Sequence, residues 1–155
     1  MLPRLHTTRP LSRSTLVFLA LILFIVIASP AQAAITPCRG DPIVETTMFR
    51  VQSVVEVYTD LANIQRVDYV YRVPLGKALP VLFDASPLAA KETAAFVSNN
   101  GSGVIQIDAV VVLKAGVAPV PVTTTTTITS KLTGNTITKT ASGLSGQVLS
   151  ITNQR

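Results

Sequence analysis

The sequence has almost none of the residues that carry most enzyme chemistry. Of its 155 residues one is cysteine, one is histidine and none is tryptophan. The histidine, His6, lies in an N-terminal segment that we expect to be removed. Without it, the chain lacks the commonest general base and the usual zinc ligand, which argues against serine or cysteine hydrolases and zinc sites. A single cysteine forms no intrachain disulfide, so the core alone must stabilise the fold.

Charged residues are also scarce, and they are not clustered. They make up 14% of the chain, with a formal net charge of +5. Three of the basic residues lie in the N-terminal segment, so ten basic and eight acidic residues remain after it. Nucleic-acid binders combine basic patches with stacking aromatics, and this chain shows neither pattern. The carboxylates are spread singly, without the pair of a glycosidase or the run of a calcium loop. We therefore predict no nucleic-acid partner, no cofactor, no metal and no enzymatic activity.

What the sequence does contain is an export signal at its N-terminus. The apolar run Leu16–Ala28 follows Arg4, Arg9 and Arg13 and precedes Ala31-Gln32-Ala33. A basic start, a short apolar run and an Ala-x-Ala end are typical of a secretory signal peptide. A membrane-spanning helix needs about 20 apolar residues, and this run is shorter. We predict a signal peptide over residues 1–33 and a secreted or cell-surface protein. The alternative is that the leader stays as an uncleaved membrane anchor.

The remaining chain, residues 34–155, is long enough for one domain and too short for two. Residues 34–42 contain two prolines and a glycine and predict an irregular N-terminal arm. From residue 43 onward, short runs rich in apolar and β-branched residues are separated by turn residues, which is typical of strands. The expected strands lie within 43–60, 66–73, 79–84, 93–98, 104–113, 122–132, 136–140 and 147–152, with a short helical turn within 86–92.

Turn residues between these runs predict which strands are neighbours. The short connection after residue 60 favours an antiparallel pair of the strands on either side. Asn99–Gly103 favours a hairpin of its flanking strands, because Asn and Gly accept positive φ. Gly134-Asn135 favours another hairpin, formed by the threonine-rich run and the strand that follows it. About eight such strands predict an all-β antiparallel sandwich over 43–155, with an immunoglobulin-like or related Greek-key topology.

Three short motifs link the chain to a group of bacterial proteins. They are Pro37-Cys38-Arg39-x-Asp41-Pro42 at the start of the mature chain, Val73-Pro74-x-Gly76, and Pro87-Leu88-x-x-Lys91-Glu92. With the Ser- and Gly-rich approach to the last strand, they resemble small exported proteins of the kind found in filamentous Chloroflexi. The resemblance implies secretion and a β-rich fold, and it brings no activity with it.

The tyrosines and the cysteine are the candidate contact residues. Tyr69 and Tyr71 share a strand face with valines and are predicted to lie in the core. Tyr58 lies on the more polar face of its strand, so it is the better candidate for contact with a ligand or partner. Cys38 either pairs with another chain or stays a free thiol in the terminal arm.

These observations favour a protein that acts by association. We predict an exported, non-catalytic sandwich domain with a structural, adhesive or cell-surface role. Its partner would be a cell-envelope polymer or another protein chain, and it would meet a membrane only through an uncleaved leader. Exposed strand edges give such domains a means of pairing. The alternative is a secreted module that binds carbohydrate or another small ligand, with Tyr58 as a stacking platform.

Overall fold

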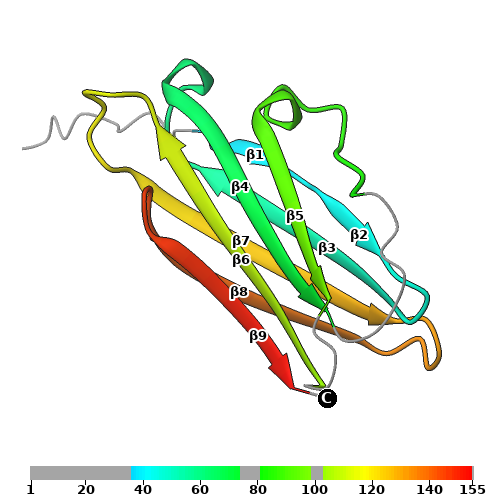
Figure 1. Cartoon of the computed structure of the whole chain (residues 1–155). Helices are drawn as coiled ribbons and strands as arrows, with labels where there is room; N and C mark the ends of the chain where they lie inside the picture. The colour runs from blue at the N-terminus through cyan, green and yellow to red at the C-terminus, as the bar shows by residue number, and fades with distance from the viewer. Residues whose placement is uncertain (1–35, 74–80, 99–102, 155) are drawn as a thin grey trace, which may run out of the picture. The chain divides into compact units, whose positions relative to one another are not determined.

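The structure is a computed structural model that describes residues 36–73, 81–98 and 103–154. The predicted signal peptide, residues 1–33, lies outside these ranges. Within them the chain forms nine strands and two 3₁₀ turns and no α-helix, so the all-β prediction is confirmed (Figure 1). The strands are β1 (Cys38–Gly40), β2 (Ile43–Glu45), β3 (Phe49–Val57), β4 (Ile64–Val73), β5 (Glu92–Ser98), β6 (Val104–Leu113), β7 (Pro121–Ser130), β8 (Thr136–Leu144) and β9 (Val148–Gln154).

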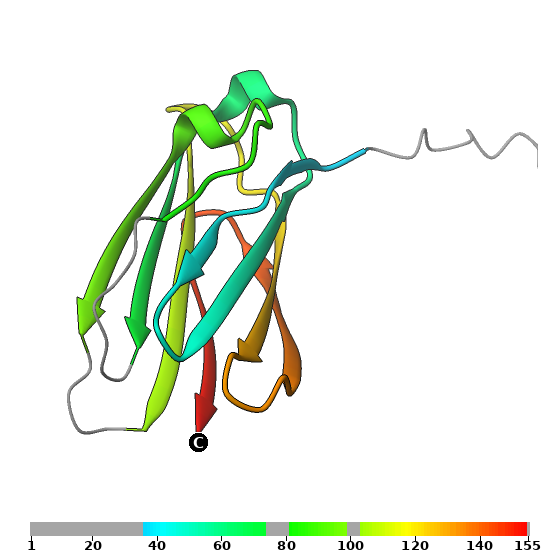
Figure 2. The ribbon, with the colours of Figure 1, turned by 90° about the vertical axis from the view of Figure 1, so that its right-hand side faces the viewer.

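The nine strands form two sheets that pack against each other, as Figure 2 shows from the side. The five-stranded sheet has the order β1-β3-β7-β8, and β2 pairs with β3 beside β1. The four-stranded sheet has the order β5-β4-β6-β9. The predicted sandwich architecture is therefore confirmed, with nine strands in the described residues where about eight were expected.

The core lies between the sheets and is built from the alternating residues that the sequence predicted. In β3 every second residue from Phe49 to Val57 is buried, including Ser53. In β4 the buried residues include Tyr69 and Tyr71, whose ring centroids lie 6.1 Å apart. Both tyrosines are almost wholly buried, which confirms their prediction as core residues. Alternation places one face of each strand inward, and the second sheet covers that face.

The predicted antiparallel pair of β3 and β4 is wrong. After β3, a 3₁₀ turn over Leu61–Asn63 takes the chain into the other sheet, where β4 begins. The strand that pairs with β3 along its whole length is β7, from Phe49↔Ser130 to Val57↔Val122. Two strands with apolar faces bury them equally well by pairing edge to edge or by packing from opposite sheets. Their adjacency in sequence therefore did not determine their pairing.

The predicted hairpin of β5 and β6 is also wrong. These two strands lie on opposite sides of β4: β5 pairs with it in parallel, and β6 pairs with it antiparallel. The sandwich is therefore not purely antiparallel. A turn reverses the chain direction without specifying that the flanking strands are neighbours, and here one strand lies between them. Most of the turn itself, residues 99–102, lies outside the described residues.

The threonine-rich hairpin is confirmed, since β7 and β8 pair from Pro121↔Leu144 to Thr129↔Thr136. β8 is longer than the expected 136–140. The region predicted as an irregular arm, residues 34–42, contains β1, which pairs with β3. The expected strand 79–84 is reduced to a single bridge, Ile43↔Leu82, and residues 79–80 lie outside the described ranges. The helical turn is a 3₁₀ turn over Ala89–Lys91.

Candidate functional site

The most exposed element of the sandwich is β8, the edge strand of the five-stranded sheet. Nine residues of β7 hold its inner side in a regular ladder, and no strand of the described residues pairs with its outer side. Two large apolar side chains of β8 are partly exposed, Ile137 at 45% and Leu144 at 44%. Leu132, just before β8, and Val148, just after it, are also exposed. Long, regular, exposed edges and grouped apolar side chains are typical of association surfaces.

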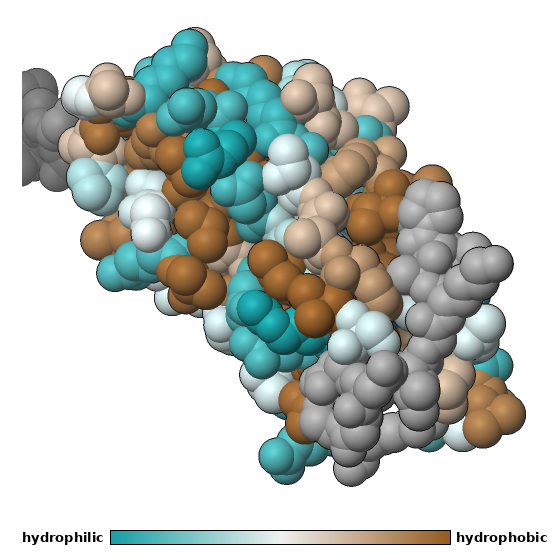
Figure 3. All heavy atoms as spheres, viewed as in Figure 1, coloured by the Kyte–Doolittle hydropathy of each residue, from teal (hydrophilic) through white to brown (hydrophobic). Residues whose placement is uncertain are grey.

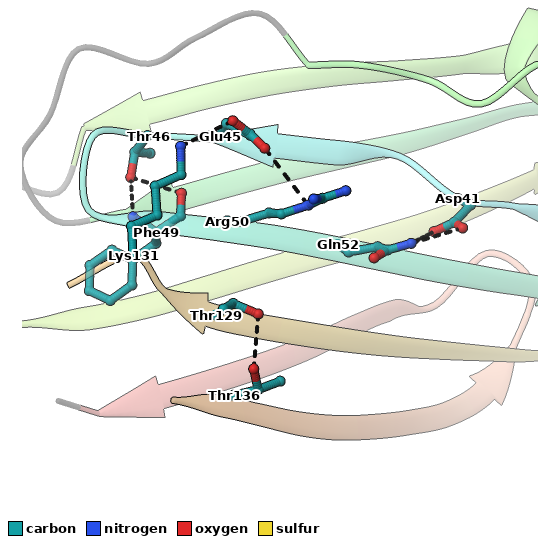
Figure 4. A network of polar contacts seen from close by, with 9 residues as sticks. All are labelled: Asp41, Glu45, Thr46, Phe49, Arg50, Gln52, Thr129, Lys131 and Thr136. Carbon is teal, nitrogen blue, oxygen red and sulfur yellow. Dashed lines mark hydrogen bonds and ion pairs between the residues drawn. The ribbon is translucent and has the colours of Figure 1, made fainter. Parts of the chain in front are cut away.

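A ladder of hydroxyl groups runs along the outer face of β7 and β8. Each outward threonine of β7 contacts the hydroxyl of its partner on β8 at an Oγ–Oγ distance of 3.1 to 3.2 Å. One of these pairs, Thr129 and Thr136, is visible in Figure 4. The four pairs are Thr123–Ser142, Thr125–Thr140, Thr127–Thr138 and Thr129–Thr136. The ladder holds β8 flat against β7 through side chains as well as through the backbone.

A small group of charges lies at the end of the same sheet, on β2, β3 and the loop after β7. The carboxylate of Glu45 accepts a hydrogen bond from Lys131 Nζ at 3.0 Å and lies 3.7 Å from Arg50 Nε (Figure 4). All three side chains are substantially solvent-exposed. Ion pairs of this kind contribute at most about 1 kcal/mol to stability. The group therefore gives the face local charge and is not a deep binding site.

The opposite edge of the five-stranded sheet is short and covered. β1 and β2 are separated by Asp41 and Pro42, and proline has no backbone N–H to offer a partner strand. Gln52 on β3 donates its side-chain amide to both carboxylate oxygens of Asp41 at 3.0 Å, which fixes this break in place (Figure 4). On the other side of β2, Ile43 forms two backbone hydrogen bonds with Leu82.

The edge strand of the other sheet that lies beside β8 is β9. Lys139 of β8 reaches across and donates a hydrogen bond from Nζ to the backbone oxygen of Thr152, at 2.6 Å. A carbonyl oxygen bound to an ammonium group is less available to a partner strand, and an inward lysine is a common way to protect an edge. Lys139 therefore covers one carbonyl oxygen of β9, while the outer side of β8 pairs with no strand of the described residues.

The outer face of the four-stranded sheet mixes charged and apolar side chains (Figure 3). At its centre Asp108 forms an ion pair with Arg72 and accepts hydrogen bonds from Ser150 Oγ, at 2.5 Å, and Gln106 Nε2, at 2.9 Å. Burial alone would raise the pKa of Asp108. The three hydrogen bonds outweigh this and hold its pKa below the ordinary aspartate value. A carboxylate fully engaged in this way links three strands and has little capacity left for a ligand.

A carboxyl group with a raised pKa lies inside the sandwich. Glu92 is only 7% exposed, and its Oε1 accepts a hydrogen bond from the hydroxyl of Tyr69 at 2.9 Å. Its Oε2 is buried and has no hydrogen-bond partner among the described residues. Burial raises the pKa of Glu92, against the hydrogen bond from Tyr69, and the carboxylates of Asp84 and Asp41 raise it further. The neutral acid is therefore more favoured here than in a free glutamate, and the group is buried against Tyr69 and away from the open edges of the sheets.

A half-open pocket of about 300 Å³ lies at the end of the sandwich where β7 turns into β8. Phe49, Ile128 and Ile137 form an apolar floor, while the amide side chains of Asn135, Asn153 and Gln154 are also part of the lining. Apolar walls with a few amides are suited to holding a small, uncharged, hydroxyl-rich ligand. Neither Cys38 nor Tyr58 is part of this lining.

Cys38 lies at the other end of the sandwich, in β1. Its thiol donates a hydrogen bond to the backbone oxygen of Thr59 at 3.0 Å. Burial raises the pKa of the thiol, and the carboxylate of Asp60 raises it further, against a smaller lowering by Lys91. The thiolate is therefore disfavoured, which reduces reactivity. A free thiol is present, but it belongs to a paired strand and not to the terminal arm that the sequence predicted.

Tyr58 follows directly after β3 and is half-buried. Its backbone N–H donates to the backbone oxygen of Pro121, so it also helps to align β7. Cys38 lines a small apolar pocket of about 260 Å³ together with Leu61, Pro87 and other residues, but Tyr58 does not. The structure therefore places both predicted contact residues at one end of the molecule without joining them in one pocket. Their roles in contact with a partner stay predictions.

Comparison with known proteins identifies no relative: no family model, no curated protein and no solved structure matches the chain. Among the residues that the structure describes, no group of three or more histidine, cysteine or acidic side chains could hold a metal ion. No helix in these ranges is long and apolar enough to cross a membrane.

Analysis of individual residues missed the open edge of β8, because an edge is a property of strand order. One signal in the sequence does point to it. The run from Thr136 to Thr140 alternates hydroxyl residues with Ile137 and Lys139. A lysine on the inward side of a strand is typical of an edge, since a central strand would bury it.

Proposed function

We propose that the protein acts by association, as an exported, non-catalytic sandwich domain with a structural, adhesive or cell-surface role. The observation that carries this proposal is the open edge of β8 with its exposed apolar side chains. The partner is another protein chain or a cell-envelope polymer. The predicted leader over 1–33 and the resemblance to small exported proteins support the extracellular setting.

The relation to immunoglobulin-like or other Greek-key sandwiches is part of this proposal. What supports it is that β3 to β4, β6 to β7 and β8 to β9 are each connections from one sheet to the other. Such crossings are typical of Greek-key sandwiches, many of which are cell-surface domains. The outer faces of both sheets then remain free for contacts.

The test uses the protein as an exporting host delivers it, with two matched variants. Leu144→Asp changes an apolar residue on β8, and Val97→Asp changes one on β5 with the same 44% exposure. We expect the wild-type protein to bind envelope polymer in cosedimentation or to self-associate in analytical ultracentrifugation. Leu144→Asp should weaken whichever complex forms by about tenfold, and Val97→Asp should leave it unchanged. A protein that stays monomeric and binds neither polymer nor cells would refute the proposal.

A second candidate function, a secreted module for carbohydrate or another small ligand, is favoured by the pocket beside Ile137. A panel of sugars should then raise the melting temperature of the protein, and Asn153→Ala, which removes an amide from the lining, should abolish the shift. Tyr58→Ala is the informative comparison. If this variant alone abolishes the shift, the ligand stacks on Tyr58 and not in the pocket. If no sugar changes the melting temperature, this candidate fails.

A further inference from the structure

The side chains of β8 are complementary to those of a second β8 that runs antiparallel to it. On its outer face every residue from Thr136 to Ser142 carries a hydroxyl group, since positions 136, 138, 140 and 142 are Thr, Thr, Thr and Ser. On its inner face, large residues come first and small residues last, in the order Ile137, Lys139, Ala141 and Gly143. Antiparallel pairing of two identical strands about their middle residue places the first half of one opposite the second half of the other.

We propose that β8 pairs antiparallel with β8 of a second copy of this chain, about a twofold axis at Thr140. The pairing joins the five-stranded sheets of both copies into one continuous sheet. This inference rests on the proposed function of association and names its partner. A twofold contact of this kind uses the same surface on both copies, so it closes as a dimer.

The outer face of such a dimer extends an arrangement that is already present in each copy. Around the axis, Thr140 lies opposite Thr140 of the second copy, and Thr138 lies opposite its Ser142. These are the same kinds of hydroxyl pair that β8 forms with β7, where Thr125 and Thr140 lie 3.1 Å apart. The hydroxyl ladder thus spans both copies, with no charged side chain among its residues.

The inner face is where the order of side-chain sizes matters. Ile137 lies opposite Gly143 of the second copy, and Lys139 lies opposite its Ala141. Each large side chain therefore extends over a small one. The two lysines are not directly opposite each other, and each ammonium group is bound to the Thr152 oxygen of its own copy. A shift of register by two residues loses this match. In one direction Lys139 meets Lys139 of the second copy, and in the other Ile137 lies opposite a residue beyond the end of β8.

The other edges of the sandwich are less suited to this contact. The β1–β2 edge is interrupted at Pro42 and bonded to Leu82, and Lys139 covers part of β9. β5 has seven residues and no repeated pattern of hydroxyl groups. A contact of nine residues on one edge is smaller than the interfaces of obligate dimers, which bury roughly 2,000 Å² or more. The dimer is therefore weak and forms at high local concentration, as on a surface.

The first test compares Thr140→Lys with Thr125→Lys, in the protein as an exporting host delivers it. Both substitutions lie on the outer face and remove the same hydroxyl pair, one from half-buried Thr125 of β7 and the other from exposed Thr140 of β8. Only Thr140→Lys places two ammonium groups opposite each other across the axis. Sedimentation equilibrium should show a weak dimer for the wild-type protein and for Thr125→Lys. Thr140→Lys should weaken the dimer by up to about fivefold, the effect of one pair of like charges.

The second test fixes the register by crosslinking, and it does not depend on the stability of the lysine variants. In a Cys38→Ser background, Thr140→Cys places two thiols opposite each other, about 5 Å apart at Cβ. Thr138→Cys places its two thiols about 13 Å apart along the strands. A thiol crosslinker of about 8 Å should give covalent dimers with Thr140→Cys and few with Thr138→Cys.

The outcomes separate this inference from the proposed function. A dimer that Thr140→Lys weakens, with crosslinks at position 140 and few at 138, supports the pairing of β8 with itself. A wild-type dimer that neither test disturbs overturns the pairing but leaves association in place. A wild-type protein that is monomeric at millimolar concentration also overturns the pairing. The proposed function then depends on its own test, which is binding to envelope polymer or cells.

Discussion

The two edges of the five-stranded sheet differ in how they end the sheet. On one side β1 and β2 are short, separated by Pro42 and bonded to Leu82. On the other side β8 is a continuous strand of nine residues with solvent on its outer side and on its threonine face. A sheet edge that is left regular and exposed risks aggregation, so most edges are interrupted or covered. The difference indicates that the sandwich protects one edge by its construction and leaves the other open to a partner.

The protected edge is packed more closely against the core than the open edge. Gly40 of β1 lies against the buried carboxyl of Glu92, so closely that a Cβ atom on Gly40 would lie 1.8 Å from Oε1. Gly143 of β8 has looser surroundings, since the nearest atoms to an added Cβ are the ends of the Gln147 and Leu149 side chains, both at 2.8 Å. Changes at the two glycines should therefore have very different costs.

The largest expected effect comes from Gly40→Ala. The added methyl group must displace Glu92 and press on Leu88, so we expect the free energy of unfolding to fall by about 3 kcal/mol. Gly143→Ala is the matched control and should cost less, about 1 kcal/mol, because the added methyl group displaces only the ends of the Gln147 and Leu149 side chains. Urea denaturation of both variants measures the difference. Equal losses would mean that the protected edge is no more tightly packed than the open one.

The next effect concerns the pH dependence that Glu92 gives to the protected edge. Because the folded state raises the pKa of Glu92, it holds a proton at pH values where the unfolded chain has lost it. This contribution to stability is complete below the ordinary glutamate pKa and is lost as pH rises through the raised pKa. Glu92→Gln keeps an acceptor for Tyr69 and does not titrate. The stability of the wild-type protein relative to this variant should therefore fall with rising pH.

The measurement is urea denaturation of both proteins at a series of pH values, from below the ordinary glutamate pKa to neutrality. Asp68 and Asp108 have lowered pKa values, so the stability that they contribute is lost as pH falls. The wild-type protein and Glu92→Gln both contain these two aspartates. Their contribution therefore cancels when the unfolding free energy of one protein is subtracted from that of the other. A difference that is independent of pH would show that folding leaves the pKa of Glu92 unchanged.

A smaller effect is expected at Lys139, the lysine of β8 that binds the Thr152 oxygen of β9. Lys139→Met keeps most of the side-chain length but removes the ammonium group that binds the Thr152 oxygen. Self-association should become stronger by up to about fivefold, since a positive charge is lost from each copy near the contact. Lys131→Met, which removes the partner of Glu45 outside β8, should not change it. Sedimentation equilibrium decides, and a weaker dimer with Lys139→Met would assign the lysine to the contact itself.

The smallest effect should come from the hydroxyl ladder. Thr127→Val removes one exposed hydroxyl pair and keeps the β-branched shape, so the free energy of unfolding should fall by about 0.5 kcal/mol or less. The same change at Thr126, in the same strand, leaves the buried Ser53 hydroxyl without its partner and should cost about 2 kcal/mol. Thermal unfolding of both variants provides the comparison. Equal losses would show that the ladder is as important as the buried pair.

The faces of the strands could be predicted from the sequence, and their neighbours could not. Alternation is local, so the buried residues of β3 and β4 and the core tyrosines were identified correctly. Pairing depends on which distant segments meet, and both the β3–β4 pair and the β5–β6 hairpin were wrong. The β7–β8 hairpin succeeded because Gly134, at φ of 73°, has the left-handed conformation that the turn signal predicts.

The candidate site was even less visible in the sequence. Cys38 and Tyr58 stood out as rare residue types, but the structure gives both of them roles in aligning strands. The buried Glu92 looked like any other single carboxylate, because its environment comes from β1 and β4. The β8 edge required the complete strand order. Rare residues can be found in a sequence directly, whereas an exposed strand edge can be found only once the order of the strands is known.

The pairing of β3 with β7 has a kinetic consequence. It joins two segments that are far apart in the chain, as the contact of Ser53 with Thr126, 73 residues later, illustrates. Closing a loop of that length costs entropy before any stabilising contact forms. We expect slow folding in which the β7–β8 hairpin, with its short turn, forms before β3 pairs with β7. Until β3 pairs, both edges of the hairpin have exposed backbone groups, which favours aggregation.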